Sequence, residues 1–353
     1  MEQAAGAPAL GKFRRQPAML VNRIASRLVQ SVPTLVGVAI IVFVLIRVVP
    51  GNPISMMLPP GATDADIERL KAFYGLDKSI VEQFFIWARE ALTGNFGTSI
   101  SLRQDVLGMV LSRLPATLEL VLIATVVAVL LGGALAVIGT RYRGRWPEAV
   151  VDTIGGIGQS VPDFIWALGF ILVFGVLMPV MPISGRSDPA ISFDYATRFY
   201  LIESLLRFDG RAFADLLSHA LMPALALGLP LVAIISRVLK GSLAEELTQD
   251  YVLLARVKGH SEWRIIVREA LRNAAIPTVN LTGVQVIFLI GGSVLVERIF
   301  SYPGIGNLSI DAVINRDLPM IQGLVLMFAV LFILVNLALD LLTIWLNPKL
   351  RHG

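Results

Sequence analysis

Six long apolar runs, separated by polar segments, form the main pattern of this chain. Each run approaches the length of about 20 residues that a helix needs to cross the hydrocarbon core of a bilayer. Within them a single charged residue occurs, Arg47, near the end of the first run. The runs are 32–49, 120–140, 164–182, 220–236, 273–296 and 318–339. The pattern predicts an all-α integral membrane protein with six transmembrane helices.

Lys and Arg are unevenly distributed over the polar segments. With the N-terminus inside, the inner segments hold 17 Lys and Arg in 87 residues, whereas the outer loops hold 12 in 125. Cytoplasmic loops are enriched in Lys and Arg, so both termini are expected in the cytoplasm. The domains expected are a basic N-terminal segment (1–30), a six-span domain (31–348) with an outer loop (50–115) and an inner insert (237–277), and a tail (349–353).

The outer loop 50–115 is expected to be structured. Two segments, 63–66 and 79–82, fit the capping-box pattern that starts a helix, and two short helices are predicted at about 65–73 and 80–92. In the second helix Phe84, Trp87 and Ala91 share a face. We expect this face to pack on the chain's own membrane-facing surface, with an extracytoplasmic partner as the alternative.

The pattern of the inner insert 237–277 predicts a helix–turn–helix. One apolar face combines Leu243, Leu247, Tyr251 and Leu254 at helical spacing. Gly259 is expected to stop this helix, and a second helix is predicted from about residue 262. Its apolar face is formed by Trp263, Ile266, Val267, Ala270, Leu271 and Ala274, and its opposite side by Arg264, Arg268 and Arg272.

Two interpretations of the insert remain open at this stage. A helix lying flat at the lipid headgroups, with its cations reaching the phosphates, accounts well for the arginines. A cytosolic docking element accounts better for the break at Gly259, His260 and Ser261 in the middle of the insert. The break favours docking to a soluble partner.

Composition supports a membrane protein without catalytic chemistry of its own. Hydrophobic residues make up 55% of the 353 residues, the mean hydropathy is +0.73, and there is no cysteine. The net charge of +4 follows from the cytoplasmic Lys and Arg and does not indicate nucleic-acid binding. No G-x-x-x-x-G-K-[ST] phosphate-binding loop occurs, nor any metalloprotease or serine-hydrolase motif. With three histidines, a metal site is not supported.

Charged residues inside the predicted membrane region are sparse. The last span is expected to continue past its apolar run, through Asp340 to about Leu346, and Glu119 directly precedes the second run. Such groups are functional candidates by default. A structural role for Asp340 is equally compatible, because it stands near the cytoplasmic end. A stand-alone secondary carrier would need a richer relay of ionisable groups and often a duplicated span pattern, which this chain lacks.

Several ordered motifs resemble the permease subunits of binding-protein-dependent ABC importers, in the dipeptide, oligopeptide and nickel branch. The resemblance runs from about Arg27 to Arg351. It rests on RVVPGNP at 47–53, YGLD at 74–77, GNFGTSI at 94–100, HALMPALALG at 219–228, DYVLLARVKG at 250–259, LRNA at 271–274, FSYPGIG at 300–306 and DLPMIQG at 317–323. The order and spacing of these motifs together make the resemblance specific.

The family's inner loop carries Glu-Ala-Ala followed by Gly four residues after the last Ala. Ala255 and Gly259 match this pattern, whereas Leu253 and Leu254 replace Glu and Ala. Such departures are typical of the peptide branch. The resemblance implies that a coupling helix docks in a groove of a separate ATPase subunit, with contacts from Ala255, Lys258, Gly259, His260, Ser261, Trp263 and Arg264. Trp263 is expected as the apolar anchor, with the chain's own core as the alternative.

The resemblance also implies the rest of the assembly. A second homologous permease, two ATPase subunits carrying ATP and Mg²⁺, and an extracytoplasmic solute-binding protein are the expected partners, in the bacterial inner membrane. This chain would then be no enzyme and hold no cofactor. Short peptides are the expected cargo, and Asn280, Thr282 and Gln285 are candidate pathway residues. A stand-alone carrier and a non-transporting scaffold are the alternatives.

Overall fold

The computed structural model describes residues 16–48, 63, 65 and 78–346, and helices dominate this part of the chain. An isolated bridge between Thr98 and Asp105 is its only β-type pairing. The α-helices are α1 (Gln16–Val48), α4 (Ile80–Leu92), α5 (Val106–Arg141), α6 (Trp146–Ser160), α7 (Asp163–Phe170), α8 (Tyr200–Leu206), α9 (Gly210–Glu246), α10 (Asp250–Val257), α11 (Glu262–Arg264), α12 (Leu271–Ile299), α13 (Ile305–Ile314) and α14 (Leu318–Leu346). Two π-helical segments, η1 (Ile171–Leu177) and η2 (Ile265–Ala270), extend α7 and join α11 to α12.

The helices confirm the predicted membrane architecture. Five continuous helical segments of the described chain are long and apolar enough to cross a membrane, namely those of α1, α5, α9, α11 through α12, and α14. The pair formed by α6 and α7 passes the same test together and makes a sixth crossing if it counts as one span.

The predicted third span, 164–182, differs from the structure in its bounds, because the helix there runs from Asp163 to Leu177 as α7 and η1. The chain bends by 102° between α6 and this helix, and only the pair together is long and apolar enough, as one broken span or as a re-entrant loop. The cause is local: Pro162 disfavours a helical conformation of the residue before it, and Val161 is extended with φ −98° and ψ 123°. The predicted run begins at residue 164, after Pro162, so both α6 and the break lie outside it.

Helix α9 is longer than the predicted run 220–236 and lies at the centre of the bundle. It spans Gly210–Glu246 and packs against α5, α6, α7 and α12. Close packing of α5 on α9 depends on small residues. A Cβ atom at Gly228 would lie 3.0 Å from the Ala124 carbonyl oxygen, and one at Gly132 would lie 2.9 Å from the Ile235 side chain.

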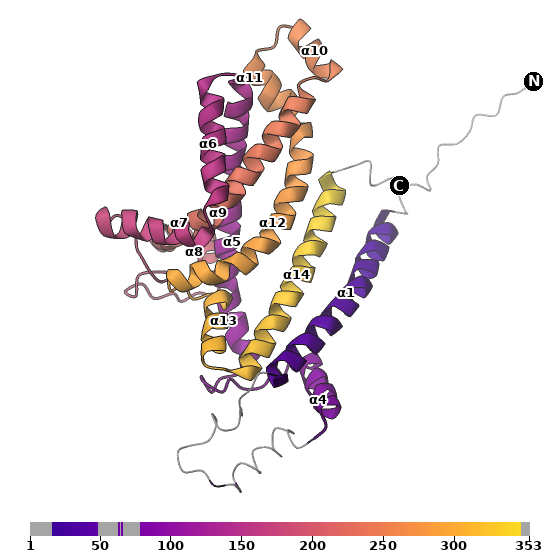
Figure 1. The fold of residues 1–353 in the computed structure, drawn as a ribbon, viewed down its shortest axis with the longest axis vertical. Coiled ribbons are helices and arrows are strands. Elements are labelled where there is room, and N and C mark those ends of the chain that lie inside the picture. The colour runs from indigo at the N-terminus through magenta and orange to yellow at the C-terminus, as the bar shows by residue number, and fades with distance from the viewer. Residues whose placement is uncertain (1–15, 49–62, 64, 66–77, 347–353) are drawn as a thin grey trace, which may run out of the picture.

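The two ends of the molecule carry different elements. Figure 1 shows α10 and α11 at one end, the insert end, and α4 and α13 at the opposite end. The first turns of α1 and the last turns of α14 lie side by side toward the insert end (Figure 1), where Arg27 pairs with Asp340. With α6 and α7 counted as one crossing, the number of crossings is even, and together with this arrangement it agrees with termini on one side of the membrane. That this side is cytoplasmic remains a prediction.

Helix α4 confirms the expected helix at 80–92. Ser79 and Glu82 form the predicted capping box, and the Phe84 and Trp87 rings lie 5.2 and 5.6 Å from the ring of Phe43 on α1. The packing interpretation of this face is therefore confirmed. Of the other expected helix, 65–73, all but residue 65 lies outside the described residues.

Candidate functional site

The inner insert is shorter than the predicted segment 237–277, because α9 continues to Glu246 and η2 already joins the bundle. Helix α10 begins only after Gln249, and this interruption shifts the helical phase. Val252 and Ala255 are buried, whereas Tyr251 and Leu254 are exposed. The predicted continuous face through Tyr251 and Leu254 is therefore wrong beyond the end of α9.

Ala255 lies where α10 meets the second arm of the insert. It is buried in a small apolar cluster with Val252 and Ile265, against which Leu247 packs. A small side chain at this position lets α10 approach η2 closely. The structure thus places Ala255 inside the insert, as a packing residue between its two arms.

The turn after α10 is a complete Schellman motif. The Gly259 N–H donates to the Arg256 carbonyl at 2.9 Å, and the His260 N–H donates to the Ala255 carbonyl at 3.1 Å. Gly259 has φ +78°, the left-handed conformation that glycine adopts readily. A Cβ atom at Gly259 would meet no atom of this chain within 4 Å. The backbone conformation, not a lack of space, therefore requires glycine here, and the predicted helix stop is confirmed.

Side chains also stabilise the part of the turn that follows Gly259. The Ser261 hydroxyl accepts a hydrogen bond from the Arg264 N–H at 3.4 Å and caps α11. Across the turn, the Arg256 Nε lies 2.9 Å from Glu262 Oε1. The helix predicted from about residue 262 begins at Glu262.

Five large apolar side chains of the insert are exposed, whereas Val252, Ile265 and Ile266 are buried against the chain. Trp263 is 52% exposed, so the alternative that it fills the chain's own core is wrong. We define the outer apolar set as the exposed large apolar residues of the insert, namely Leu253, Leu254, Val257, Trp263 and Val267. Lys258 and Arg264 are exposed beside it, and His260 is half-buried. The insert presents an apolar surface with cations, as a docking element would.

A hydrogen-bonded tyrosine fixes α10 against the bundle. The Tyr251 hydroxyl donates to Glu246 Oε2 at 2.5 Å and accepts from Asn273 Nδ2 at 3.4 Å. Burial raises the pKa of the Tyr251 phenol, and the Glu246 carboxylate adds to the shift. The hydroxyl therefore stays protonated and connects α9, α10 and α12.

The π-helix η2 transmits contact from the insert to the membrane helices. Ile265 packs on α10, whereas Ile266 and Ala270 pack with Ala274 against Ala136, Leu239 and Leu243 of α5 and α9. Of the predicted apolar face, Ile266, Ala270 and Ala274 are buried, while Trp263 and Val267 are exposed. The insert is thus joined directly to the core of the bundle.

The three candidate pathway residues do not share one face of α12. Asn280 is exposed, Thr282 is buried and Gln285 is half-buried. The Thr282 hydroxyl donates to the Thr278 carbonyl at 2.8 Å, within its own helix. Of the three, Asn280 and Gln285 retain exposed surface.

Both carboxylates noted in the sequence have a cationic partner. Glu119 lies 2.6 Å from an Nη atom of Arg186, with both side chains buried, and it also accepts the Ile202 N–H at 3.1 Å. Arg186 in turn lies over the Tyr200 ring, 4.4 Å from its centroid. This pair ties the segment before α8 to α5, and it is a structural contact.

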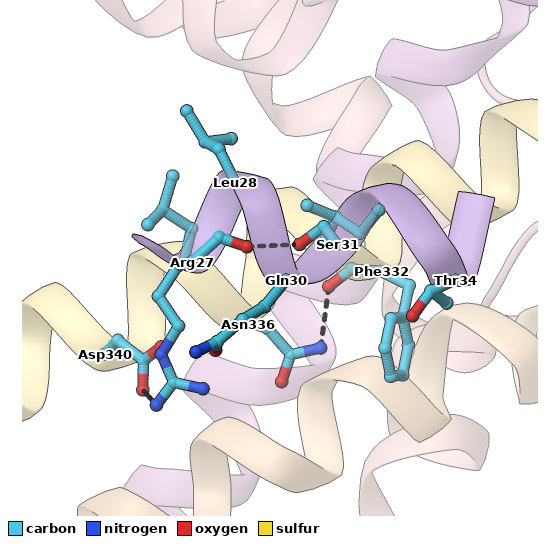
Figure 2. Close-up of a pocket in the computed structure, with 10 residues that line it drawn as sticks. Arg27, Leu28, Gln30, Ser31, Thr34, Phe332, Asn336 and Asp340 are labelled. Atoms are coloured by element: carbon cyan, nitrogen blue, oxygen red, sulfur yellow. Dashed lines mark hydrogen bonds and ion pairs between the residues drawn. The ribbon is translucent and has the colours of Figure 1, made fainter. Parts of the chain in front are cut away.

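Asp340 belongs to a polar groove between α1 and α14. Figure 2 shows the Arg27 guanidinium reaching the Asp340 carboxylate, with Nε to Oδ2 at 2.8 Å. The groove has a volume of about 250 Å³, and its polar lining includes Gln30, Ser31, Thr34 and Asn336. The pair holds the peripheral helix α1 to α14.

Two further carboxylates within the candidate spans were not predicted as candidate residues from the sequence. Glu297 is fully buried and accepts hydrogen bonds from the Thr117 hydroxyl at 2.7 Å and the Asn307 N–H at 3.0 Å. Asp163 starts α7 at the break in the third crossing. Each stands just outside a predicted apolar run, and that position was the available signal. Within the described residues, no cluster of His, Cys, Asp or Glu suits a metal ion.

Comparison with known proteins identifies the family. The profile described as "Binding-protein-dependent transport system inner membrane component" matches residues 124–352, and the profile of the N-terminal part of such components matches 19–121. The "Di/tripeptide transport system permease protein DppB" of Pseudomonas aeruginosa is 39% identical over 335 residues, covering 94% of this chain and 99% of that protein. The "Glutathione transport system permease protein GsiC" of Escherichia coli K12 is 34% identical over 333 residues, covering 94% and 100%.

A solved structure titled for inward facing conformations of the MetNI methionine ABC transporter also aligns, at 16% identity and a TM-score of 0.49, over 66% of this chain and 93% of the other.

The two profiles and the curated relatives cover nearly the whole chain. The chain therefore belongs to the family of binding-protein-dependent transport system inner membrane components, as a multi-pass permease subunit of an ABC importer.

Proposed function

We propose that this permease docks through the turn between α10 and α12 onto a separate ATPase subunit, which carries ATP and Mg²⁺, so that the chain itself is not an enzyme. The observation that carries the proposal is the outer apolar set of the insert, in which Trp263 is 52% exposed. An exposed tryptophan flanked by aliphatic residues is typical of an anchor that becomes buried on binding.

Each residue of the turn has a distinct role in this proposal. Trp263 fills an apolar groove of the ATPase, and Lys258 and Arg264 meet acidic groups at its rim. Gly259, His260 and Ser261 fix the shape of the turn, through the Schellman motif and the cap of α11. Ala255 allows the two arms of the insert to pack closely.

The same contacts explain how ATP would act on the membrane helices. Ile265 and Ile266 connect the turn to α5 and α9 without an intervening flexible loop. A movement of the ATPase is therefore transmitted to the bundle. ATP and a loaded binding protein need to favour different states of the bundle, since a ligand shifts an equilibrium only by its differential affinity.

We infer the remaining assembly from the relatives. Their names refer to di- and tripeptide and to glutathione transport, so short peptides are the proposed cargo. An extracytoplasmic binding protein delivers it, and a second homologous permease completes the pathway in the bacterial inner membrane. Asn280 and Gln285 are proposed to line that pathway, with Thr282 packed behind them.

A matched pair of glycines tests the docking role. Gly259 and Gly144 both have positive φ, +78° and +75°, and a Cβ atom at either would meet no atom of this chain within 4 Å. A side chain at either position strains the backbone by roughly 1–2 kcal/mol. In proteoliposomes containing the assembled importer, we expect Gly259→Trp to abolish peptide import and Gly144→Trp to retain most of it. Both variants should be present in the membrane at the wild-type level.

Equal import by the two variants would overturn the proposal, because bulk at the docking turn would then be no worse than the same strain elsewhere. Loss of import by both would also contradict it, since backbone strain alone would explain the result.

A further inference from the structure

The break in the third crossing places a carboxylate inside the bundle. Helix α6 ends at Ser160, the chain is extended at Val161 and Pro162, and Asp163 is the first residue of α7. In Figure 1, α6 runs along the bundle and α7 leaves it sideways. Breaks of this kind in membrane helices are where transport proteins commonly build binding sites.

The Asp163 side chain lies against α12. A Cβ atom at Gly292 would stand 2.9 Å from Asp163 Oδ2, and 4.0 Å from Leu227 Cδ2 of α9. Glycine at position 292 thus allows the carboxylate to approach the α12 backbone. Asp163 is half-buried where α7, α9 and α12 meet.

Four other carboxylates within the candidate spans have side-chain or backbone partners from other segments of the chain. Asp152 pairs with Lys240 at 2.5 Å, Glu119 with Arg186 and Asp340 with Arg27, while Glu297 accepts a hydroxyl and a backbone N–H from other segments. For Asp163, the donors within the described residues are backbone N–H groups of its own turn, that of Phe164 at 2.7 Å and its own, and no ion pair is formed.

A second unmatched polar atom follows one turn later. The Nε1–H of Trp166 is buried and has no hydrogen-bond partner in the described chain. The first turn of α7 therefore offers both an acceptor without a cation and a donor without an acceptor. Neither group suits contact with hydrocarbon, because an unpaired charge or a buried unsatisfied donor is costly there.

We propose that Asp163 receives the cationic amino group of the cargo as it passes between the two permeases. This inference rests on the proposed function and names the chemistry of its pathway: a primary ammonium, such as the free amino terminus of a short peptide. A charge-assisted hydrogen bond of this kind satisfies the carboxylate only while cargo is present. Trp166 adds a donor one turn along the same helix.

Transport by substituted importers tests the proposal. In proteoliposomes with saturating binding protein and a dipeptide, Asp163→Asn is expected to lower import per ATP hydrolysed by roughly ten- to a hundredfold, the effect of losing one charge-assisted bond. Asp163→Glu should restore at least part of it. The control Asp194→Asn makes the same chemical change at an exposed position before α8 and should import like the wild type.

Two readouts separate cargo binding from a structural role. Assembly with the ATPase, and ATPase stimulation by the loaded binding protein, should be unchanged in Asp163→Asn. Wild-type import per ATP in the variant overturns the inference. The inference is also overturned if Asp163→Asn assembles poorly but the complexes that remain import normally. That result would indicate an ion pair between Asp163 and the second permease. Failure of the wild type to import would instead count against the proposed function.

Protection of Asp163 by cargo against a carboxyl-modifying reagent supplies an independent measurement. Dicyclohexylcarbodiimide should modify Asp163, quantified by mass spectrometry, in complexes trapped with vanadate without cargo. Trapping with the dipeptide present should protect it. Equal modification with and without cargo, or no modification in either state, would overturn the proposal.

Discussion

Glu203 illustrates how single carboxylates are held in the segment before α9. Its oxygens accept hydrogen bonds from the Thr197 hydroxyl at 2.6 Å, from the Thr197 and Ala196 N–H groups at 2.8 Å, and from Arg207. These donors, the Thr197 hydroxyl foremost, lower the pKa of Glu203 from an ordinary value of 4.5 to about 2. The ionised form is therefore favoured in the folded protein.

This shift predicts a pH dependence of stability. Because the pKa is lower when folded, the carboxylate stabilises the protein above pH 4.5, and that contribution is lost as the pH falls from 4.5 toward 2. In detergent at neutral pH, Glu203→Gln should have a lower melting temperature than the wild type. As the pH falls from 4.5 toward 2, the melting temperature of Glu203→Gln should decrease less than that of the wild type. Glu245→Gln, at an exposed position, is the control. Parallel pH profiles of wild type and Glu203→Gln would contradict the assignment.

At the scale of elements, α13 is held by side chains from two other helices. Its N-cap residue is Gly304, which has no side chain to cap the helix. Instead the Thr117 hydroxyl of α5 accepts the Ile305 N–H at 2.9 Å, and Glu297 of α12 accepts the Asn307 N–H at 3.0 Å. A Cβ atom at Gly304 would collide with both side chains. The motif at 300–306 therefore joins α5, α12 and α13 into one unit.

We expect Thr117→Val to destabilise the protein by about 2 kcal/mol. The substitution preserves shape but removes two buried hydrogen bonds, leaving the Ile305 N–H unsatisfied. Thr125→Val is the matched control, because the Thr125 hydroxyl bonds only to the Val121 carbonyl of its own helix. Melting temperatures in detergent measure the difference, and equal values for the two variants would show that the cap contributes little.

Features that depend only on neighbouring residues could be predicted from the sequence. The stop at Gly259 and the start of α4 follow from turn and capping chemistry, and both were predicted correctly. The break at Val161 was missed because the predicted apolar run starts only after Pro162, and α6, whose apolar residues are interrupted by polar ones and glycines, was not predicted. The phase of α10 was missed because it depends on where α9 ends.

Long-range contacts were not readable from the sequence. The partners of Glu119 and Asp340 lie 67 and 313 residues away along the chain. Trp263 has helical spacing with Ile266 and Ala270, so periodicity alone could not decide that it faces outward. That decision depends on η2, whose π-helical turn has no clear signal in the sequence.

At the scale of the whole molecule, the fold connects the insert end, where docking is proposed, to a central bundle. Helix α9 packs against α5, α6, α7 and α12, while α1 is held at the edge by α14 and α4. The insert extends from the ends of α9 and α12 (Figure 1). A force at α10 and α11 therefore acts first on the helices that line Asp163, through η2 and α12.

One labelling measurement tests both the orientation and the docking role of the insert. The chain has no cysteine, so Lys258→Cys gives a single reactive site in the exposed turn, and Asp194→Cys gives one in the segment before α8. A membrane-impermeant maleimide should label Asp194→Cys but not Lys258→Cys in intact spheroplasts. In inside-out vesicles stripped with urea, Lys258→Cys should react rapidly, and rebinding of the purified ATPase subunits should protect it. Labelling of Lys258→Cys from outside, or equal reactivity with and without bound ATPase, would contradict the account.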